Sequence, residues 1–158
     1  AFGGPMYYGH SYEGYDPDNA YFYQTKSVLK VFESLNKKQR ELAIAKGSPG
    51  EQAKSVTFRA KGQATPGIAF ADLNAEQQEL VQHSMKTILN LYRKEDADEV
   101  MQIIKKTGGM DDMHLAFYPD KDQKGDSPWR FWRLEGPGFV WNYRVLPHVH
   151  CFVNIAKV

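Results

Sequence analysis

The stretch PWRFWRLEGPGFVWNYRVLPHVHCF, residues 128–152, decides the fold that the sequence predicts. It contains all three tryptophans, the single cysteine and two of the five histidines. Apolar and polar residues alternate along Trp129–Glu135 and along Phe139–Val145, and Gly136-Pro137-Gly138 lies between the two runs. Alternation on both sides of a glycine-rich turn predicts a β-hairpin. His148–Ile155 alternates in the same way and predicts a last strand.

The residues before this stretch predict helices. Apolar side chains recur at three- and four-residue spacing from Phe22 to Leu35, in a helix that we expect to begin near Asp16 or Asp18. Asn36 is the expected N-cap of a helix over residues 37–46. Asn74-Ala75-Glu76-Gln77 has the form of a capping box and predicts a helix that runs to about Tyr92. A further helix is expected over residues 97–107, ended by Gly108.

Two short segments also alternate, Ser55–Ala60 and His114–Tyr118, and each predicts a strand. Helices followed by an antiparallel meander predict an α+β fold, with N-terminal helices packed on a C-terminal antiparallel sheet of about three to five strands. Residues 18–158 are expected to form this single domain. Residues 1–17 interleave glycine with tyrosine and predict an arm, which is either a frayed terminus or packs on its own domain or on a partner.

Composition excludes several classes of protein. The chain has 158 residues, 20 basic and 19 acidic, without a long run of one sign. Nucleic-acid binders need a concentrated basic face, so we expect no nucleic-acid partner. No apolar run approaches the roughly 18 residues that span a bilayer, so we expect no membrane span. Ala1 is a small residue of the kind found at signal-cleavage sites and favours a periplasmic or extracellular location, with the cytoplasm as the alternative.

Three blocks carry a resemblance to a known family. They are Leu35–Arg40 (LNKKQR), Pro66–Gln78 (PGIAFADLNAEQQ) and Arg133–Pro137 (RLEGP), the last followed by His148-Val149-His150. In order and spacing the chain resembles the family catalogued as domain of unknown function 3500. That family is functionally uncharacterised, so the resemblance implies a shared fold and candidate positions, without an activity.

The two histidines of the last strand are the first candidate site. His148 and His150 are two residues apart, so both side chains project from one face, while Cys151 points to the other face and is expected to be a buried small hydrophobe. Two imidazoles on one face can converge on zinc, copper or iron. A third ligand is needed, and the candidates are His10, His114, Asp111 and Asp112. The alternative is a hydrogen-bonded pair on the sheet surface.

The second candidate site is an interaction surface of aromatic and arginine side chains. Large aromatic rings fall on both faces of the predicted hairpin. The helices can cover only one face, so another segment, a ligand or a partner is needed to cover the rings on the other face. Tyrosine, tryptophan and arginine are enriched at protein interfaces. The residues of this predicted surface are Tyr7, Tyr8, Tyr12, Tyr15, Trp129, Arg130, Trp132, Arg133, Trp141 and Arg144.

Two hypotheses of function follow from these two sites. The first is a non-catalytic binding or assembly subunit that associates with itself or with a larger complex through the aromatic-arginine face and the tyrosine-rich arm. The second is a small metal-binding protein or metal-dependent enzyme centred on His148 and His150. A phosphate-binding glycine loop, a dinucleotide fingerprint and a Cys-x-x-Cys pair are all absent from the sequence, so it points to no specific reaction.

Overall fold

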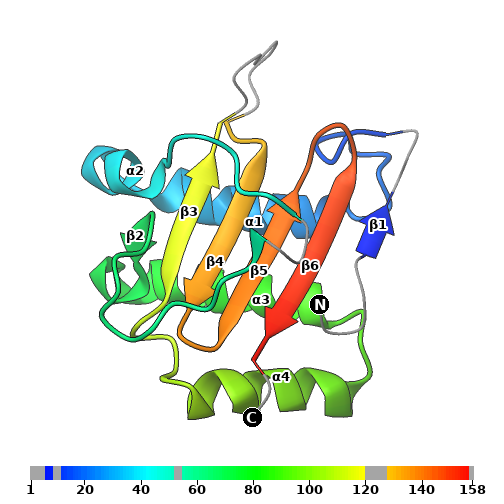
Figure 1. Ribbon diagram of the computed structural model, residues 1–158. Helices are drawn as coiled ribbons and strands as arrows, with labels where there is room; N and C mark the ends of the chain where they lie inside the picture. The colour runs from blue at the N-terminus through cyan, green and yellow to red at the C-terminus, as the bar shows by residue number, and fades with distance from the viewer. Residues whose placement is uncertain (1–5, 9–11, 52–54, 120–127, 157–158) are drawn as a thin grey trace.

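The computed structural model describes residues 6–8, 12–51, 55–119 and 128–156 (Figure 1). Within them lies a six-stranded antiparallel sheet in the order β1-β6-β5-β4-β3-β2. Its strands are β1 (Met6–Tyr8), β2 (Ile68–Ala69), β3 (His114–Tyr118), β4 (Phe131–Gly136), β5 (Phe139–Arg144) and β6 (Val149–Ile155). The helices are α1 (Phe22–Ser34), α2 (Lys37–Ala43), α3 (Ala75–Leu89) and α4 (Lys94–Lys106), with a 3₁₀ turn at Phe70–Asp72. The predicted α+β fold is confirmed.

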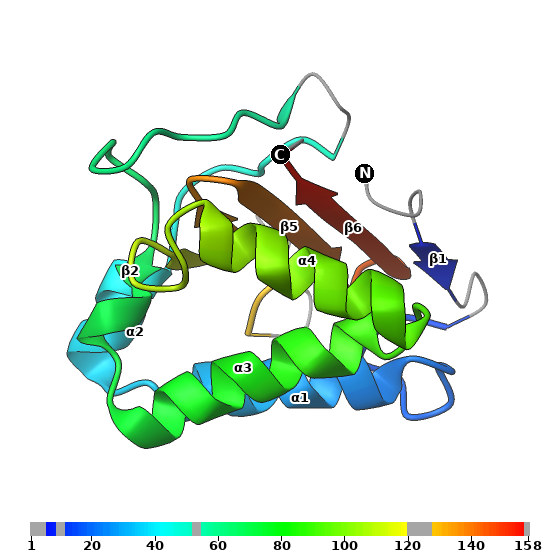
Figure 2. The ribbon, with the colours of Figure 1, turned by 90° about the horizontal axis from the view of Figure 1, so that it is seen from below.

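The helices and an irregular segment lie on opposite faces of the sheet. Helices α1, α3 and α4 lie on one side, which we call the inner face (Figure 2). The segment that follows α2 and leads to β2 crosses the other side, the outer face (Figures 1 and 2). In the part of the chain that the structure describes, no helix is long and apolar enough to cross a membrane.

Capping boxes begin two of the helices as predicted. The side chains of Asn36 and Asn74 each accept a hydrogen bond from the backbone N–H three residues later, at 3.0 and 2.9 Å. The glutamines at those positions, Gln39 and Gln77, accept in return from the N-cap N–H groups, both at 3.0 Å. The two glutamine side chains also bond to each other at 2.9 Å. One repeated motif thus begins α2 and α3 and joins them.

The C-terminal meander follows the predicted alternation. Gly136 pairs with Phe139, which leaves Pro137-Gly138 as a two-residue turn between β4 and β5. Strand β6 pairs with β5 on one side and with β1 on the other. The sequence did not predict β1 or β2, because each has only two or three residues and no alternation of its own.

Two predicted elements differ from the structure. Helix α1 begins at Phe22, because the preceding residues form turns in which Asn19 accepts from the Tyr21 N–H and donates to the carbonyl of Tyr12. The segment Ser55–Ala60 is not a strand. It lies over the sheet and contacts it through polar groups, such as an ion pair from Arg59 and the carbonyl of Ser55. A segment held by such side-chain contacts does not pair as a strand, so its sequence need not alternate between apolar and polar residues.

The other helix boundaries shift by three residues. Helix α2 ends at Ala43 rather than Lys46, because Ile44 bridges to Phe117 and Ala45 donates to the Phe117 carbonyl. Helix α3 ends at Leu89, and α4 begins at Lys94. The predicted stop after α4 is confirmed, since Gly108 and Gly109 both have positive φ and the Gly109 N–H returns to the carbonyl of Ile104. That arrangement is a Schellman motif.

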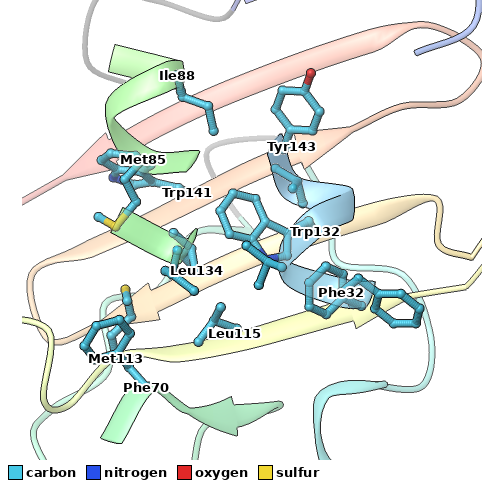
Figure 3. Close-up of a cluster of buried hydrophobic side chains, with 14 of the residues drawn as sticks. Phe32, Phe70, Met85, Ile88, Met113, Leu115, Trp132, Leu134, Trp141 and Tyr143 are labelled. Atoms are coloured by element: carbon cyan, nitrogen blue, oxygen red, sulfur yellow. The ribbon is translucent and has the colours of Figure 1, made fainter. Parts of the chain in front are cut away.

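The three tryptophans lie in the core between the inner face and the helices. Trp129 and Trp132 are fully buried and Trp141 is 1 % exposed. Figure 3 shows Trp132 and Trp141 among Leu134, Met85 and other apolar side chains. Cys151 is buried in the same cluster, and burial raises the pKa of its thiol to about 12. The interpretation of Cys151 as a small core residue is confirmed.

Part of the predicted arm packs on this domain. The backbone of Met6–Tyr8 pairs with β6, with Tyr7 opposite His150 and Tyr8 opposite Val149. The Gly14 N–H donates to the carbonyl of Val145 at 2.7 Å. The Tyr15 hydroxyl donates to the carbonyl of Trp129, and burial raises the pKa of Tyr15. The division of the chain between residues 17 and 18 stays a prediction.

Candidate functional site

The outer face of the sheet carries polar side chains where the inner face is apolar. Strand alternation directs every second residue of β3–β6 away from the helices, and the pairing register arranges these residues in three rows. One row holds Tyr118, Phe131, Arg144 and His150; the next holds Ala116, Arg133, Asn142 and Phe152; the third holds His114, Glu135, Val140 and Asn154. Arg133, Glu135, Asn142 and Asn154 are each less than 9 % exposed. Polar groups this buried on a sheet face imply a cover.

The cover is the chain's own segment between α2 and β2. Three of its residues contact the outer face: Glu51 binds Arg144, Ser55 accepts from Arg133 through its carbonyl at 3.1 Å, and Arg59 binds Glu135. The segment crosses in front of the sheet in Figure 1. Sequence analysis identified the need for a cover without identifying these residues. Glu51, the one acidic residue in a segment rich in glycine and small residues, is the signal that could have found it.

A buried glutamate between two arginines anchors the cover to β4. The Arg59 Nε atom lies 3.0 Å from Oε2 of Glu135, and Arg133 Nε lies 3.5 Å from Oε1 of the same carboxylate. The side chains of Glu135 and Arg133 are 5 % and 9 % exposed. Two positive charges thus share one negative charge in a poorly solvated position, where the loss of any member is costly.

The second polar group on this face, which we call the histidine cluster, consists of Glu51, Arg144, His148 and His150. Nε2 of His150 lies 2.7 Å from Nε2 of His148, and their ring centroids are 4.6 Å apart. Nδ1 of His150 lies 2.7 Å from Nη2 of Arg144 and 3.3 Å from Oε2 of Glu51. Arg144 Nη1 also donates to Glu51 at 3.0 Å. Side-chain exposures of 14 to 21 % for Glu51, Arg144 and His150 leave the cluster open to solvent on one side.

The partners of His150 indicate where its proton lies. A guanidinium only donates, so Nδ1 accepts from Arg144 and the neutral ring carries its proton on Nε2. That proton is donated to Nε2 of His148. In the other tautomer Nδ1 carries the proton and donates to Glu51, and both Nε2 lone pairs then point toward the same place. The cluster can therefore hold either a shared proton or a cation between the two rings.

The ionisation of Glu51 in this cluster is perturbed. Burial raises the pKa of its carboxyl group, and the charges of Arg144 and Arg130 oppose that rise in pKa. Oε1 of Glu51 is buried and has no hydrogen-bond partner among the described residues. The cluster thus contains a carboxylate oxygen with unused capacity to accept a hydrogen bond or bind a cation.

Three other predicted metal ligands, His114, Asp111 and Asp112, do not join the histidine cluster. His114 lies on β3, in the third row of the outer face, whereas His150 lies on β6 in the first row. Asp111 and Asp112 lie beside His114 at the same end of the sheet. His10 lies outside the described residues. A search of those residues finds no group of three or more histidine, cysteine, aspartate or glutamate side chains placed to hold one ion.

The predicted interaction surface loses its tryptophans. All three belong to the core: Trp129, Trp132 and Trp141. Strand alternation would put Trp129 on the same face as Phe131, but it does not apply to Trp129 because β4 begins only at Phe131. Arg133 and Arg144 do lie on the outer face, in contact with Ser55, Glu135 and Glu51. Arg130 is close enough to Glu51 to influence its pKa. Of the tyrosines, Tyr12 is 44 % exposed, Tyr15 contacts Trp129, and only the backbone is described for Tyr7 and Tyr8.

Comparison with known proteins gives one match. The model of the family described as Protein of unknown function (DUF3500) matches residues 11–154. The match covers nearly the whole chain and confirms the resemblance seen in the sequence blocks. No curated protein and no solved structure matches the chain.

Proposed function

Because the chain belongs to the DUF3500 family, whose description assigns no activity, we propose from geometry that it is a metal-binding protein. In this proposal His148 and His150 hold a transition metal ion, zinc, copper or iron, at the outer face. The observation that carries it is that the two Nε2 atoms converge on one point of the outer face, 2.7 Å apart as a hydrogen-bonded pair. Tetrahedral coordination of one ion needs them to separate to roughly 3.3 Å. Neutral imidazole nitrogens are the preferred protein ligands of these ions, and two that converge from one strand form a chelating pair.

The surroundings of the pair support this function. Metal-binding histidines usually donate their other ring N–H to a carboxylate, which orients the ring. Glu51 lies 3.3 Å from Nδ1 of His150 and can take this role once the ring proton moves to Nδ1 and Nη2 of Arg144, a donor 2.7 Å from the same nitrogen, turns away. Arg144 holds the same carboxylate through Nη1. Glu51, Arg144 and His150 are each 14 to 21 % exposed, so water can reach the cluster as a further ligand of the ion.

The third protein ligand is open. His10 follows Tyr8 by two residues in the sequence, and Tyr8 pairs with Val149, the residue between the two histidines. His10 lies outside the described residues and remains a candidate from the sequence. His114 is not, because it lies at the other end of the sheet.

Replacing both histidines should remove metal binding. We expect zinc affinity measured by isothermal titration calorimetry to fall at least about 100-fold in the His148→Ala/His150→Ala variant, since no chelating nitrogens remain. The controls are His83→Ala on α3 and His114→Ala on β3, which should bind zinc as the unchanged protein does. Equal zinc binding by the double variant and the unchanged protein would sink the proposal. His10→Ala in the same series tests the third ligand.

Glu51 should tune this affinity. The Glu51→Gln variant is expected to bind zinc about 10- to 100-fold more weakly, because the amide cannot accept the ring N–H as strongly as a carboxylate does. Zinc affinity should also fall as the pH is lowered, because protons compete for the imidazoles and Glu51 loses its charge at a higher pH than an ordinary carboxyl group. A pH series of titrations on both proteins checks this. If the zinc affinity of Glu51→Gln depends less on pH, the result supports Glu51 as the acceptor of the ring N–H. If Glu51→Gln binds zinc with the affinity of the unchanged protein, the result contradicts that role.

Assembly with itself or with a larger complex stays a prediction. The burial of Trp129, Trp132 and Trp141 removes the largest rings from the surface that was to carry it. Tyr12, which is 44 % exposed, remains available to such a surface. Size-exclusion chromatography with light scattering tests this role, and a strict monomer with no partner in native extract counts against it.

A further inference from the structure

A cleft of about 350 Å³ lies at the end of the sheet away from the histidine cluster. The loop of residues 59–65 forms one wall, residues 111–114 form the other, and the β4–β5 turn at Gly136-Pro137 completes the lining. Its volume falls within the range of small-molecule sites, roughly 300–1,000 Å³. His114 belongs to the third row of the outer face and His150 to the first, so this cleft is separate from the histidine cluster.

The loop wall is held in shape by its own hydrogen bonds. The Gln63 N–H donates to the Ala60 carbonyl at 3.0 Å, and the Gln63 side chain accepts from the Ala60 N–H at 3.1 Å. Arg59 Nη1 donates to the Ala64 carbonyl at 2.9 Å, while its Nε is paired with the buried Glu135. The wall is therefore a preformed loop fixed to β4.

The two walls carry opposite charges that meet across the cleft. Nζ of Lys61 on the loop lies 3.2 Å from Oδ2 of Asp112 on the opposite wall. The Lys61 side chain is 79 % exposed, so it can move away from Asp112 at little cost. The Asp112 side chain is 25 % exposed. Its Oδ2 atom is within ion-pair distance of Lys61 but accepts no hydrogen bond among the described residues. This ion pair is one that a ligand can replace.

His114 supplies a polar atom with unused capacity beside that pair. Its Nδ1 is buried and has no hydrogen-bond partner in the described part of the chain. Buried ring nitrogens are ordinarily hydrogen-bonded, so His114, which lines the cleft, has an unused hydrogen-bonding atom beside the ion pair.

We propose that this cleft binds a small zwitterion of the class of free α-amino acids. The ligand carboxylate replaces Asp112 as the partner of Lys61, and the ligand ammonium group binds Asp112 and donates to Nδ1 of His114. The charged residues of the lining, Arg59 and Lys61 against Asp111 and Asp112, balance one another. A ligand that carries both charges preserves that balance and exchanges one ion pair for two. A ligand with a single charge would leave Lys61 or Asp112 without its partner.

The test is NMR titration of ¹⁵N-labelled protein in EDTA, which keeps it independent of metal binding. The probes are glycine, L-alanine and L-glutamine, with acetate and methylammonium as single-charge controls. We expect saturable shifts of residues 59–65 and 111–114 with at least one amino acid. Affinity should fall at least about tenfold in Lys61→Met and in Asp112→Asn, and should be unchanged in Lys30→Met, an exposed lysine on α1.

Three results would overturn the proposal. The first is that none of the three amino acids gives saturable shifts. The second is that Lys61→Met and Asp112→Asn bind the amino acid with the affinity of the unchanged protein. The third is that acetate or methylammonium alone binds as tightly as the amino acids. Because Lys61 is mostly exposed, its variant should keep the fold, and the unchanged shifts of the core residues check this. Zinc titration of Lys61→Met should match the unchanged protein, so failure of the cleft and failure of the metal site are distinguishable.

Discussion

Replacing Glu135 with alanine is expected to lower the free energy of unfolding by about 3–5 kcal/mol. Its carboxylate is the shared partner of Arg59 and Arg133, and its side chain is only 5 % exposed. Without it the Arg133 charge, 9 % exposed, loses the carboxylate that neutralises it and keeps uncharged acceptors such as the carbonyl of Ser55. The residue also anchors the covering segment, so its loss should expose the outer face.

Urea unfolding followed by circular dichroism measures this change. The matched control is Asp98→Ala, which breaks the ion pair of Asp98 with Lys94 at exposures of 55 and 81 %. Such a surface pair contributes at most about 1 kcal/mol. If Glu135→Ala costs no more than Asp98→Ala, the buried triad does not hold the cover in place.

Replacing Gly67 with alanine should have an effect of similar size. Gly67 precedes β2 with a φ of +98°, a backbone conformation that L-residues rarely adopt. A Cβ atom here would lie 2.0 Å from the carbonyl oxygen of Leu115, which is backbone of β3 and cannot move without disturbing the sheet. Backbone strain and overpacking together are expected to cost about 3 kcal/mol or more.

Gly62 provides the control for this substitution. It also has a positive φ, +77°, but a Cβ atom would meet nothing within 4 Å. Gly62→Ala should therefore cost only the conformational strain, about 1–2 kcal/mol. Thermal unfolding of both variants separates the two contributions. Equal losses would mean that the close approach of β2 to β3 is not required.

Local chemistry explains which parts of the fold the sequence predicted. Asn36 and Asn74 predicted helix starts because an N-cap and its third residue lie within one turn. The hairpin and β6 were predicted because successive side chains of a strand point to opposite faces, so apolar and polar residues alternate with a period of two. The placement of Cys151 inside and of His148 and His150 outside followed from the same period.

Contacts between distant segments explain what was missed. The covering segment contacts the sheet through pairs such as Arg59 with Glu135 and Glu51 with His150, which are 76 and 99 residues apart in sequence. No local pattern marks such pairs. The tryptophans were assigned to a surface because the hairpin has rings on both faces, whereas in the structure β4 begins only at Phe131 and all three tryptophans reach the inner core. The extracellular or periplasmic location stays a prediction.

The central claim is that His148 and His150 together bind one metal ion. Electron paramagnetic resonance of the protein with one equivalent of Cu²⁺ tests it most directly, because nitrogen ligands split the copper signal. We expect hyperfine coupling to imidazole nitrogen that disappears in the His148→Ala/His150→Ala variant and persists in His114→Ala. A copper spectrum that is the same in the unchanged protein and in the double variant would contradict it.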